Sequence, residues 1–339
     1  IADATPALMI ALAIFVVAFI VILFTKIEEP EQAPVQVSLI KGALKFRHFA
    51  LGALAIFLYM GIEVGTPTYI LQYLTADTPE IKAKKVAVLE AKDTYANETQ
   101  LAKAFILAPD SAVVTPANVE ELFEAKVLAD IEATIEDAKD RGKEVSDAFL
   151  TDNEKTTRAN WEKQVTDTKE KIADETISVA KVEKAIEGRG MAAGVVTLIV
   201  AVYWLMMLIG RFVGSSIGNK ISSRTMITTV SIACIVLVAF GMFAPASSTV
   251  TVPGIDWAKL KMIWPEVPVG IFAFLLVGLC TSFMWGGIFN MAVEGLGKYT
   301  AIASGIFMTM VFGGAVMVAF QGWIADLTDY MTSYWVVLF

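Results

Sequence analysis

Histidine, cysteine and charge are all scarce in this 339-residue chain. It has one histidine and two cysteines, and only 18% of its residues are charged. Cys234 and Cys280 both lie in apolar runs, so the sequence offers neither a disulfide framework nor a Cys/His cluster suited to a metal. There is also no phosphate-binding loop and no Ser/His/Asp set. We therefore expect no enzyme active site, no cofactor and no metal.

The few charges are concentrated in one segment. Residues 75–190 hold 17 basic and 25 acidic residues, whereas the rest of the chain holds only ten of each sign. The whole net charge of −8 therefore belongs to that segment. An acidic balance of this kind argues against a nucleic-acid-binding protein, which needs a basic face. With 56% hydrophobic residues, the chain has the composition of a membrane protein with one soluble insertion.

Six charge-poor runs are long enough to cross a bilayer, which requires about 20 apolar residues per helix. Glu63 is the only charge inside any of them. A seventh run begins at Tyr330, and the chain stops within it at Phe339, so the sequence looks cut at both ends. The six runs are 4–25, 49–76, 190–210, 225–255, 267–293 and 299–325, and the last few residues of 225–255 are expected to form loop.

We therefore predict an all-α polytopic membrane protein with six complete transmembrane helices and the start of a seventh. Residues 1–25 form the first helix, 26–48 a cytoplasmic linker and 49–76 the second helix. Residues 77–189 form a soluble helical insert outside the cytoplasm, and 190–339 hold the remaining helices. This orientation follows from the excess of basic residues near short cytoplasmic loops. Those residues are Lys26, Lys41, Lys45, Arg47, Arg211, Lys220 and Arg224, and the loop 256–266 then faces outward with the insert.

The insert has two runs of apolar residues at helical spacing, which predict amphipathic helices packed as a hairpin or bundle. Its charges are typical of a solvated helical surface, and a docking face for an extracytoplasmic protein is the alternative. The first run is Val119, Leu122, Phe123, Val127, Ile131 and Ile135; the second is Trp161, Val165, Ile172, Ile177, Val179 and Val182.

Short motifs within the spans occur in a fixed order. They are FLYMGIEVG at 57–65, YW at 203–204, IGRFVG at 209–214, WGGIF at 285–289, EGLGKYTAIASG at 294–305, GGA at 313–315 and QGWIAD at 321–326. In this order and spacing they resemble the fucose/galactose/glucose–proton symporter family of the major facilitator superfamily.

The resemblance implies part of a twelve-helix transporter, with the six spans as the family's helices six to eleven and the chain end as the start of twelve. It implies secondary active transport of a monosaccharide such as glucose, galactose or fucose, by cation (H⁺) symport with alternating access, in the bacterial inner membrane. Two features depart from the family: the insert is unusually long, and WGGIF replaces the family's aromatic–Pro–Thr–Ile–Phe sequence. The resemblance does not identify the sugar, and it leaves H⁺ and Na⁺ both open as the coupling ion.

A sugar site near the bilayer midplane needs groups that hydrogen-bond hydroxyls and an aromatic face that packs on the sugar ring. The candidates are Glu63, Thr66, Gln72, Trp285 and Asn290. Glu63 is also the candidate for proton coupling, because an acid at that depth is costly to bury and usually functional. A structural carboxyl bonded to a neighbouring helix is the alternative.

A gating role is suggested by the glycines and the arginine at the end of the third span. Gly210, Arg211 and Gly214 occupy the position of a superfamily loop that latches helices in one state, and Arg211 is the candidate latch. Charges that only set topology explain the outer basic residues equally well. His48, at the edge of a span, is expected to be an interfacial residue, with a proton-handling role as the alternative. Membrane lipid is an expected partner of the spans.

A different class of protein also fits these observations. A membrane-anchored interaction protein would display the 77–189 insert to a partner. Such an anchor needs neither a midplane acid nor glycine-rich spans, so Glu63 favours the transporter.

Overall fold

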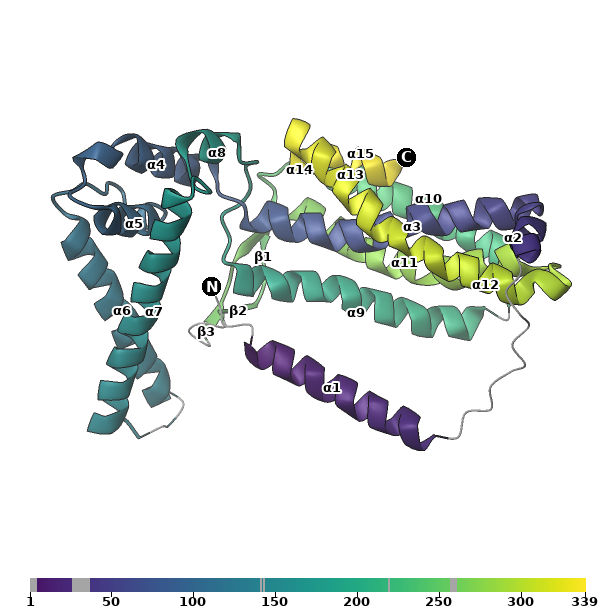
Figure 1. The fold of residues 1–339 in the computed structure, drawn as a ribbon, viewed down its shortest axis with the longest axis horizontal. Helices are drawn as coiled ribbons and strands as arrows, with labels where there is room; N and C mark the ends of the chain where they lie inside the picture. Colours follow the sequence, from purple (N-terminus) through teal and green to yellow (C-terminus); the bar gives the residue numbers. More distant parts are fainter. Residues whose placement is uncertain (1–4, 26–36, 141, 143, 219, 257–260) are drawn as a thin grey trace.

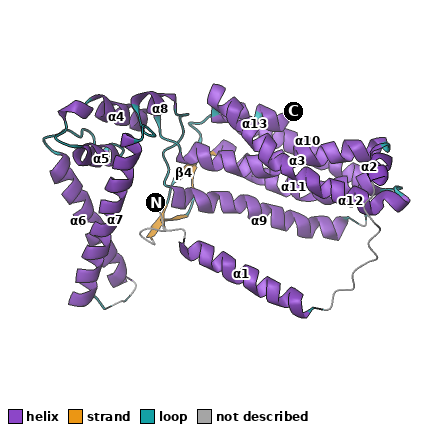
Figure 2. Cartoon of the chain, viewed as in Figure 1, coloured by secondary structure: helices purple, strands orange, loops and turns teal. Residues whose placement is uncertain are grey.

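The computed structural model describes residues 1–339 apart from 1–4, 26–36, 141, 143, 219 and 257–260 (Figure 1). Residues 26–36 of the predicted linker, with Lys26 among them, therefore lie outside the described residues. Nearly all regular structure is helical, and the strands are confined to one loop (Figure 2).

Five helical segments of the described chain are long and apolar enough to cross a membrane. A sixth apolar helix, α1 (Thr5–Phe24), contains no charged residue and lies apart from the others (Figure 1). The all-α polytopic membrane fold is thus confirmed. The five segments are α3 (Arg47–Thr75), α9 (Ala193–Ile217), α10 (Ser223–Phe243), α11 (Val269–Val293) and the stretch Gly297–Leu327.

The stretch Gly297–Leu327 is not one uniform helix. It consists of η2 (Gly297–Tyr299), α12 (Thr300–Thr309), η3 (Met310–Phe312) and α13 (Gly313–Leu327). The start of the predicted seventh span is two short helical turns, α14 (Tyr330–Ser333) and α15 (Trp335–Leu338). Another short helix, α2 (Val37–Leu44), precedes α3 and packs against α12.

The loop expected in the last few residues of the run 225–255 begins earlier than predicted, because α10 ends at Phe243. Pro245 follows Ala244, and a residue before proline is driven toward extended backbone; Ala244 accordingly has a ψ of 134°. Two antiparallel strand pairs replace the rest of the run. β1 (Thr249–Thr251) pairs with β4 (Glu266–Pro268), and β2 (Gly254–Asp256) pairs with β3 (Lys261–Ile263).

Helix α11 forms the centre of the membrane bundle, with α3, α9 and α10 packed around it. Its buried residues include Ile271, Phe274, Val277 and Met284, which join the main apolar core. Helix α13 packs on the far side of α3. Because α3 contacts both α11 and α13, side chains on opposite faces of α3 meet different partners.

The insert is a separate helical unit at one end of the bundle (Figure 1). Its longest helices, α6 and α7, run side by side, and its small core includes Phe123 and Trp161, whose rings lie 5.6 Å apart. The indole of Trp161 donates a hydrogen bond to Asp130 at 3.2 Å. The helices are α4 (Pro79–Glu90), η1 (Lys92–Thr94), α5 (Glu98–Leu107), α6 (Val119–Asp140), α7 (Asp147–Ala173) and α8 (Val179–Lys184).

One detail of the insert prediction is wrong. The second apolar run does not form one helix, because α7 ends at Ala173 and a new short helix begins at Val179. Between them Glu175 has a left-handed backbone with φ of 55°, which breaks the helix. Ile177 lies in this turn.

Backbone hydrogen bonds fix the insert to the end of α3. The amides of Gly188, Arg189, Gly190 and Met191 donate to Asp77, Tyr73, Ala76 and Leu74 at 2.7–3.0 Å. Gly188 must be glycine for this approach, since a Cβ there would collide with the Tyr73 carbonyl and with Ala76. The chain therefore enters and leaves the insert through one narrow base.

Candidate functional site

A line of polar residues runs along one face of α3. Tyr59, Glu63 and Thr66 follow one another at helical spacings of four and three, which places them on the same side. Tyr59 and Thr66 are buried, and Glu63 is half-buried. Pro67 lies in the next turn and has no N–H, so the carbonyl of Glu63 lacks its usual helical donor. The middle of α3 thus carries two hydroxyls and a carboxyl within two helical turns.

Tyr59 connects this face to α11 and α9. Its hydroxyl donates to the carbonyl oxygen of Thr281 in α11 at 3.0 Å. The carboxyl of Glu63 lies one helical turn from Tyr59 on the same face of α3, where it is a second potential acceptor for this hydroxyl. The hydroxyl of Tyr203 from α9 lies 3.5 Å from the Thr281 hydroxyl. Helices α3, α9 and α11 therefore meet at Tyr59 and Thr281.

Trp285 reaches the same cluster through its ring. The indole is half-buried, with its centre 6.2 Å from the ring of Tyr59 and 5.7 Å from that of Phe307. Two of the five predicted binding residues, Glu63 and Trp285, are thus brought together by contacts with Tyr59.

Thr66 sits deeper in the bundle, where its side chain is fully buried. Its hydroxyl oxygen has no hydrogen-bond partner among the described residues. Its carbonyl accepts a hydrogen bond from the Tyr334 hydroxyl at 2.8 Å. A buried hydroxyl without a partner costs about 1–3 kcal/mol, so Thr66 is a group that a polar ligand or water would stabilise.

Gln72 and Asn290 do not join this cluster. Both side chains are exposed, Gln72 three residues before the end of α3 and Asn290 three residues before the end of α11. Because α3 leads into the insert and α11 leads away from the strand loop at that same end, the two residues lie toward opposite ends of the bundle.

The glycines of the predicted gate bring α9 against α11. A Cβ on Gly210 would meet the Ser282 hydroxyl and lie 2.8 Å from the Leu279 carbonyl, and one on Gly214 would lie 2.9 Å from the Phe283 ring. Arg211 is exposed beside them, 3.8 Å from the sulfur of Met207. No ion pair joins it to a carboxylate of the described residues. Close helix packing therefore accounts for both glycines.

His48 lies at the other end of the bundle from the insert. It is exposed, and one ring nitrogen is 2.9 Å from the carbonyl of Glu294. It takes no part in the cluster around Glu63.

Several site residues were absent from the sequence prediction. Tyr59, Tyr203 and Thr281 carry the hydrogen bonds of the cluster, and Gln321 is a buried amide that donates to Ser333 at 3.3 Å. A tyrosine one turn before a mid-span acid is a usable signal for Tyr59. Thr281 offered none, since it lies in an apolar run far from Glu63 in sequence.

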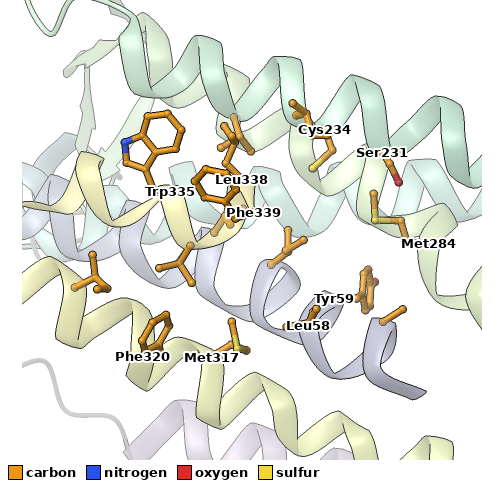
Figure 3. A pocket seen from close by; sticks show the side chains of 17 residues that line it. Leu58, Tyr59, Ser231, Cys234, Met284, Met317, Phe320, Trp335, Leu338 and Phe339 are labelled. Atoms are coloured by element: carbon orange, nitrogen blue, oxygen red, sulfur yellow. The ribbon is translucent and has the colours of Figure 1, made fainter. Parts of the chain in front are cut away.

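A cavity of about 590 Å³ lies beside the cluster between α3, α10, α13 and the chain end (Figure 3). Its walls are almost entirely apolar, with Leu58, Met284, Phe320 and Trp335 among them, and Tyr59 forms part of one wall. A sugar needs several hydrogen-bonding groups, so this cavity does not have the chemistry of a sugar site.

Two ionisable side chains of the insert have a raised pKa. Burial raises the pKa of the Tyr95 hydroxyl. Hydrogen bonds from Arg158 to Glu154 and to Glu124 raise the pKa of its guanidinium. Neither group belongs to a cluster with metal ligands, and no group of three or more such ligands gathers within the described part of the chain.

Known proteins resemble part of this chain. No family model matches it. A putative glucose/galactose transporter of Helicobacter pylori strain J99 is 27% identical over 125 residues, and a glucose/galactose transporter of Brucella abortus is 28% identical over 127. Over these residues the chain is similar in sequence to glucose/galactose transporters. The resemblance inferred from the motifs is thus confirmed over that part, and the expectation that the chain is not an enzyme agrees with these relatives.

The aligned part is 37–38% of this chain but only 26% of each relative, so it spans about a quarter of their length. Among solved structures, the major facilitator transporter FucP in its outward conformation is similar, with 13% identity and a TM-score of 0.36. That comparison covers 90% of this chain and 87% of FucP.

Proposed function

We propose that the protein is a secondary active transporter for a monosaccharide of the hexose or deoxyhexose class, coupled to a cation, with H⁺ as the first candidate. The observation that carries this proposal is the cluster of Glu63, Tyr59 and Trp285 in the middle of the membrane bundle. The names of the sequence relatives support a sugar as the substrate. As a multi-pass protein related to bacterial transporters, it is assigned to the bacterial inner membrane, in contact with lipid.

In this proposal Glu63 has the coupling role. A carboxyl in the membrane is costly unless it is paired or neutral, and its cost is justified where it carries a proton. The Tyr59 hydroxyl lies one helical turn away on the same face of α3 and is a potential hydrogen-bond donor to the carboxylate. Protonation of Glu63 removes the negative charge of its carboxylate and so changes which contacts α3 makes. Glu63 therefore has a route to affect its neighbours.

Trp285 and Thr66 are the proposed sugar contacts. An indole face suits the C–H face of a pyranose, and the half-buried ring of Trp285 leaves part of its surface open. The unpaired Thr66 hydroxyl is a ready partner for a sugar hydroxyl or a bound water. Gln72 and Asn290 remain proposed contacts nearer the two ends, where their exposed side chains would meet sugar during entry and release. Gly210, Arg211 and Gly214 remain the proposed gate, with Arg211 as the candidate latch.

The test is counterflow of labelled hexoses in liposomes containing the intact protein. We expect unlabelled sugar inside to drive entry of its labelled form, with a rate that depends on external pH and not on sodium. Dependence on sodium alone would replace H⁺ by Na⁺ as the coupling ion. No counterflow of any hexose or deoxyhexose, from protein shown to be folded in the membrane, would contradict the proposal.

A second candidate function is display of the insert to an extracytoplasmic protein. The observation that favours it is the insert's own core, which does not depend on the membrane helices. Deletion of the insert separates the two functions, because Leu74 and Met191 already share a hydrogen bond of 2.8 Å and a short linker can join them. Retained transport in the deletion makes the insert accessory, and complete loss in a protein that reaches the membrane makes it part of the mechanism.

A further inference from the structure

The hydroxyl of Tyr59 has one proton and two acceptors that belong to different helices. One acceptor is the Thr281 carbonyl of α11 at 3.0 Å. The other potential acceptor is the carboxyl of Glu63, which lies one turn further along α3 on the same face of the helix. A phenol donates only one hydrogen bond, so the two acceptors compete for it. Tyr59 is 3% exposed, so water offers little alternative partner.

The competition for the Tyr59 hydroxyl can affect Trp285, because Thr281 lies one turn before Trp285 on α11. Within α11 the amide of residue i bonds to the carbonyl of residue i−4, so the Thr281 carbonyl also receives the backbone N–H of Trp285. The Tyr59 ring additionally touches the Trp285 ring, with centres 6.2 Å apart. Tyr59 therefore contacts both the backbone turn that carries Trp285 and the indole itself.

We propose that Tyr59 is a positioning residue that links the protonation of Glu63 to the place of Trp285 on α11. This inference rests on the proposed function, since it takes Glu63 as the coupling acid and Trp285 as a sugar contact. An ionised carboxylate is the stronger acceptor and draws the Tyr59 proton to α3. A protonated Glu63 accepts more weakly, and the Tyr59 hydroxyl then bonds to Thr281 and ties α3 to α11.

The other groups around the pair do not compete for this role. From α9, Arg211 contributes a fixed positive charge and Tyr203 a hydroxyl beside Thr281. Cys234 from α10 and Cys280 from α11 are buried thiols that neighbour Tyr203. Among these groups Glu63 is the carboxylic acid, so a change of pH alters the hydrogen bonding of Tyr59 through Glu63.

Tyr59→Phe tests the inference because it removes the hydroxyl and keeps the ring. We measure half-saturation for sugar exchange across a pH series in liposomes with wild type, Tyr59→Phe and Glu63→Gln. The hydroxyl's bond corresponds to a change of about 2- to 10-fold in affinity. We expect the wild-type value to shift by this much with pH, and both variants to lose the shift while still exchanging sugar.

Tyr69→Phe is the matched control. Tyr69 lies on α3 and also donates to a carbonyl across the bundle, that of Val318 at 2.7 Å, but on α13. Its variant should keep the wild-type pH profile. A wild-type profile in Tyr59→Phe, alongside its loss in Glu63→Gln, would overturn the role of Tyr59 and leave Glu63 as the coupling acid. A wild-type profile in Glu63→Gln would remove the coupling role itself.

A second measurement covers the case in which Tyr59→Phe does not fold. 3-Fluorotyrosine at position 59 keeps both ring and hydroxyl, and its ¹⁹F signal reports the hydrogen bonding of that hydroxyl. We expect the signal to move with pH in an otherwise wild-type protein and to stay fixed when Glu63 is Gln. A ¹⁹F signal that does not change with pH, or that changes equally in both proteins, contradicts the inference.

Discussion

The position of Trp285 predicts that its removal weakens sugar binding and leaves ion coupling unchanged. Its ring packs between Tyr59 and Phe307 and is half-buried, and it has no proton to exchange. Trp285→Ala should raise the half-saturating sugar concentration about 2- to 10-fold, the size of an aromatic contact, and leave the ratio of accumulated to external sugar at saturation unchanged. Exchange kinetics in proteoliposomes measure both quantities.

Trp323→Ala is the control for that prediction. Trp323 lies on α13 with 57% of its surface exposed, away from the α3–α11 contact, so its removal should not alter half-saturation. Equal effects of the two substitutions, or none from Trp285→Ala, would show that Trp285 has no direct role in binding.

The residues of the site differ in how far sequence alone could reveal them. Glu63 is visible because a charge interrupts an apolar run, and Trp285 because an aromatic precedes two glycines. The roles of Tyr59 and Thr281 depend on a contact between residues 222 positions apart in the sequence, which no local pattern predicts. Gln72 and Asn290 look as polar as Thr66 in the sequence, and only the packing shows which of the three is buried.

At the scale of helices, the contact of α9 with α11 depends on Gly210. An added methyl there would meet the Leu279 carbonyl at 2.8 Å and the Ser282 hydroxyl, and a backbone carbonyl in a helix cannot move aside cheaply. Gly210→Ala should therefore destabilise the protein by about 1–3 kcal/mol, the usual cost of overpacking. Thermal unfolding in detergent measures the loss as a lowered Tm.

Gly305→Ala provides the comparison within the same bundle. Its Cβ would have nothing within 4 Å, so only helix propensity changes, and the Tm should stay or rise slightly. If both alanines behave alike, the close approach of α9 to α11 at Gly210 is not what the structure indicates.

Helix positions follow from composition more readily than helix ends. Apolar runs of sufficient length predicted the membrane helices, because a bilayer demands uninterrupted apolar surface. Hydropathy alone does not show that α10 ends before Pro245, so the predicted span continues past Phe243 and only the last few residues of its run are predicted as loop. In the insert, helical spacing continued past Ala173 by coincidence, and the turn at Glu175 divides the run.

The two ends of the molecule differ, so cysteine labelling can determine which end faces the cytoplasm. The insert and the strand loop lie at one end, where β2 contacts the start of α9, and α2 lies at the other (Figure 1). If basic loops face the cytoplasm, a cysteine at Glu136 should react with an impermeant maleimide from outside, and one at Lys220 should react only after permeabilisation. Both positions are exposed, whereas Cys234 and Cys280 are buried.

Labelling is followed by the mass added to each single-cysteine variant in intact cells. Reaction at Lys220 from outside, with Glu136 protected, would reverse the orientation. The proposed role of the Glu63 cluster does not depend on the orientation, since α3 crosses the membrane in either case.

The central claim is that Glu63 couples ion movement to sugar movement, and one experiment addresses it directly. Proteoliposomes with the intact protein, as wild type or Glu63→Gln, are given a proton gradient and labelled sugar, and accumulation is compared with gradient-free exchange. The account predicts accumulation and exchange in wild type, and exchange without accumulation in Glu63→Gln. Wild-type accumulation by Glu63→Gln would contradict it and leave Glu63 as a structural carboxyl.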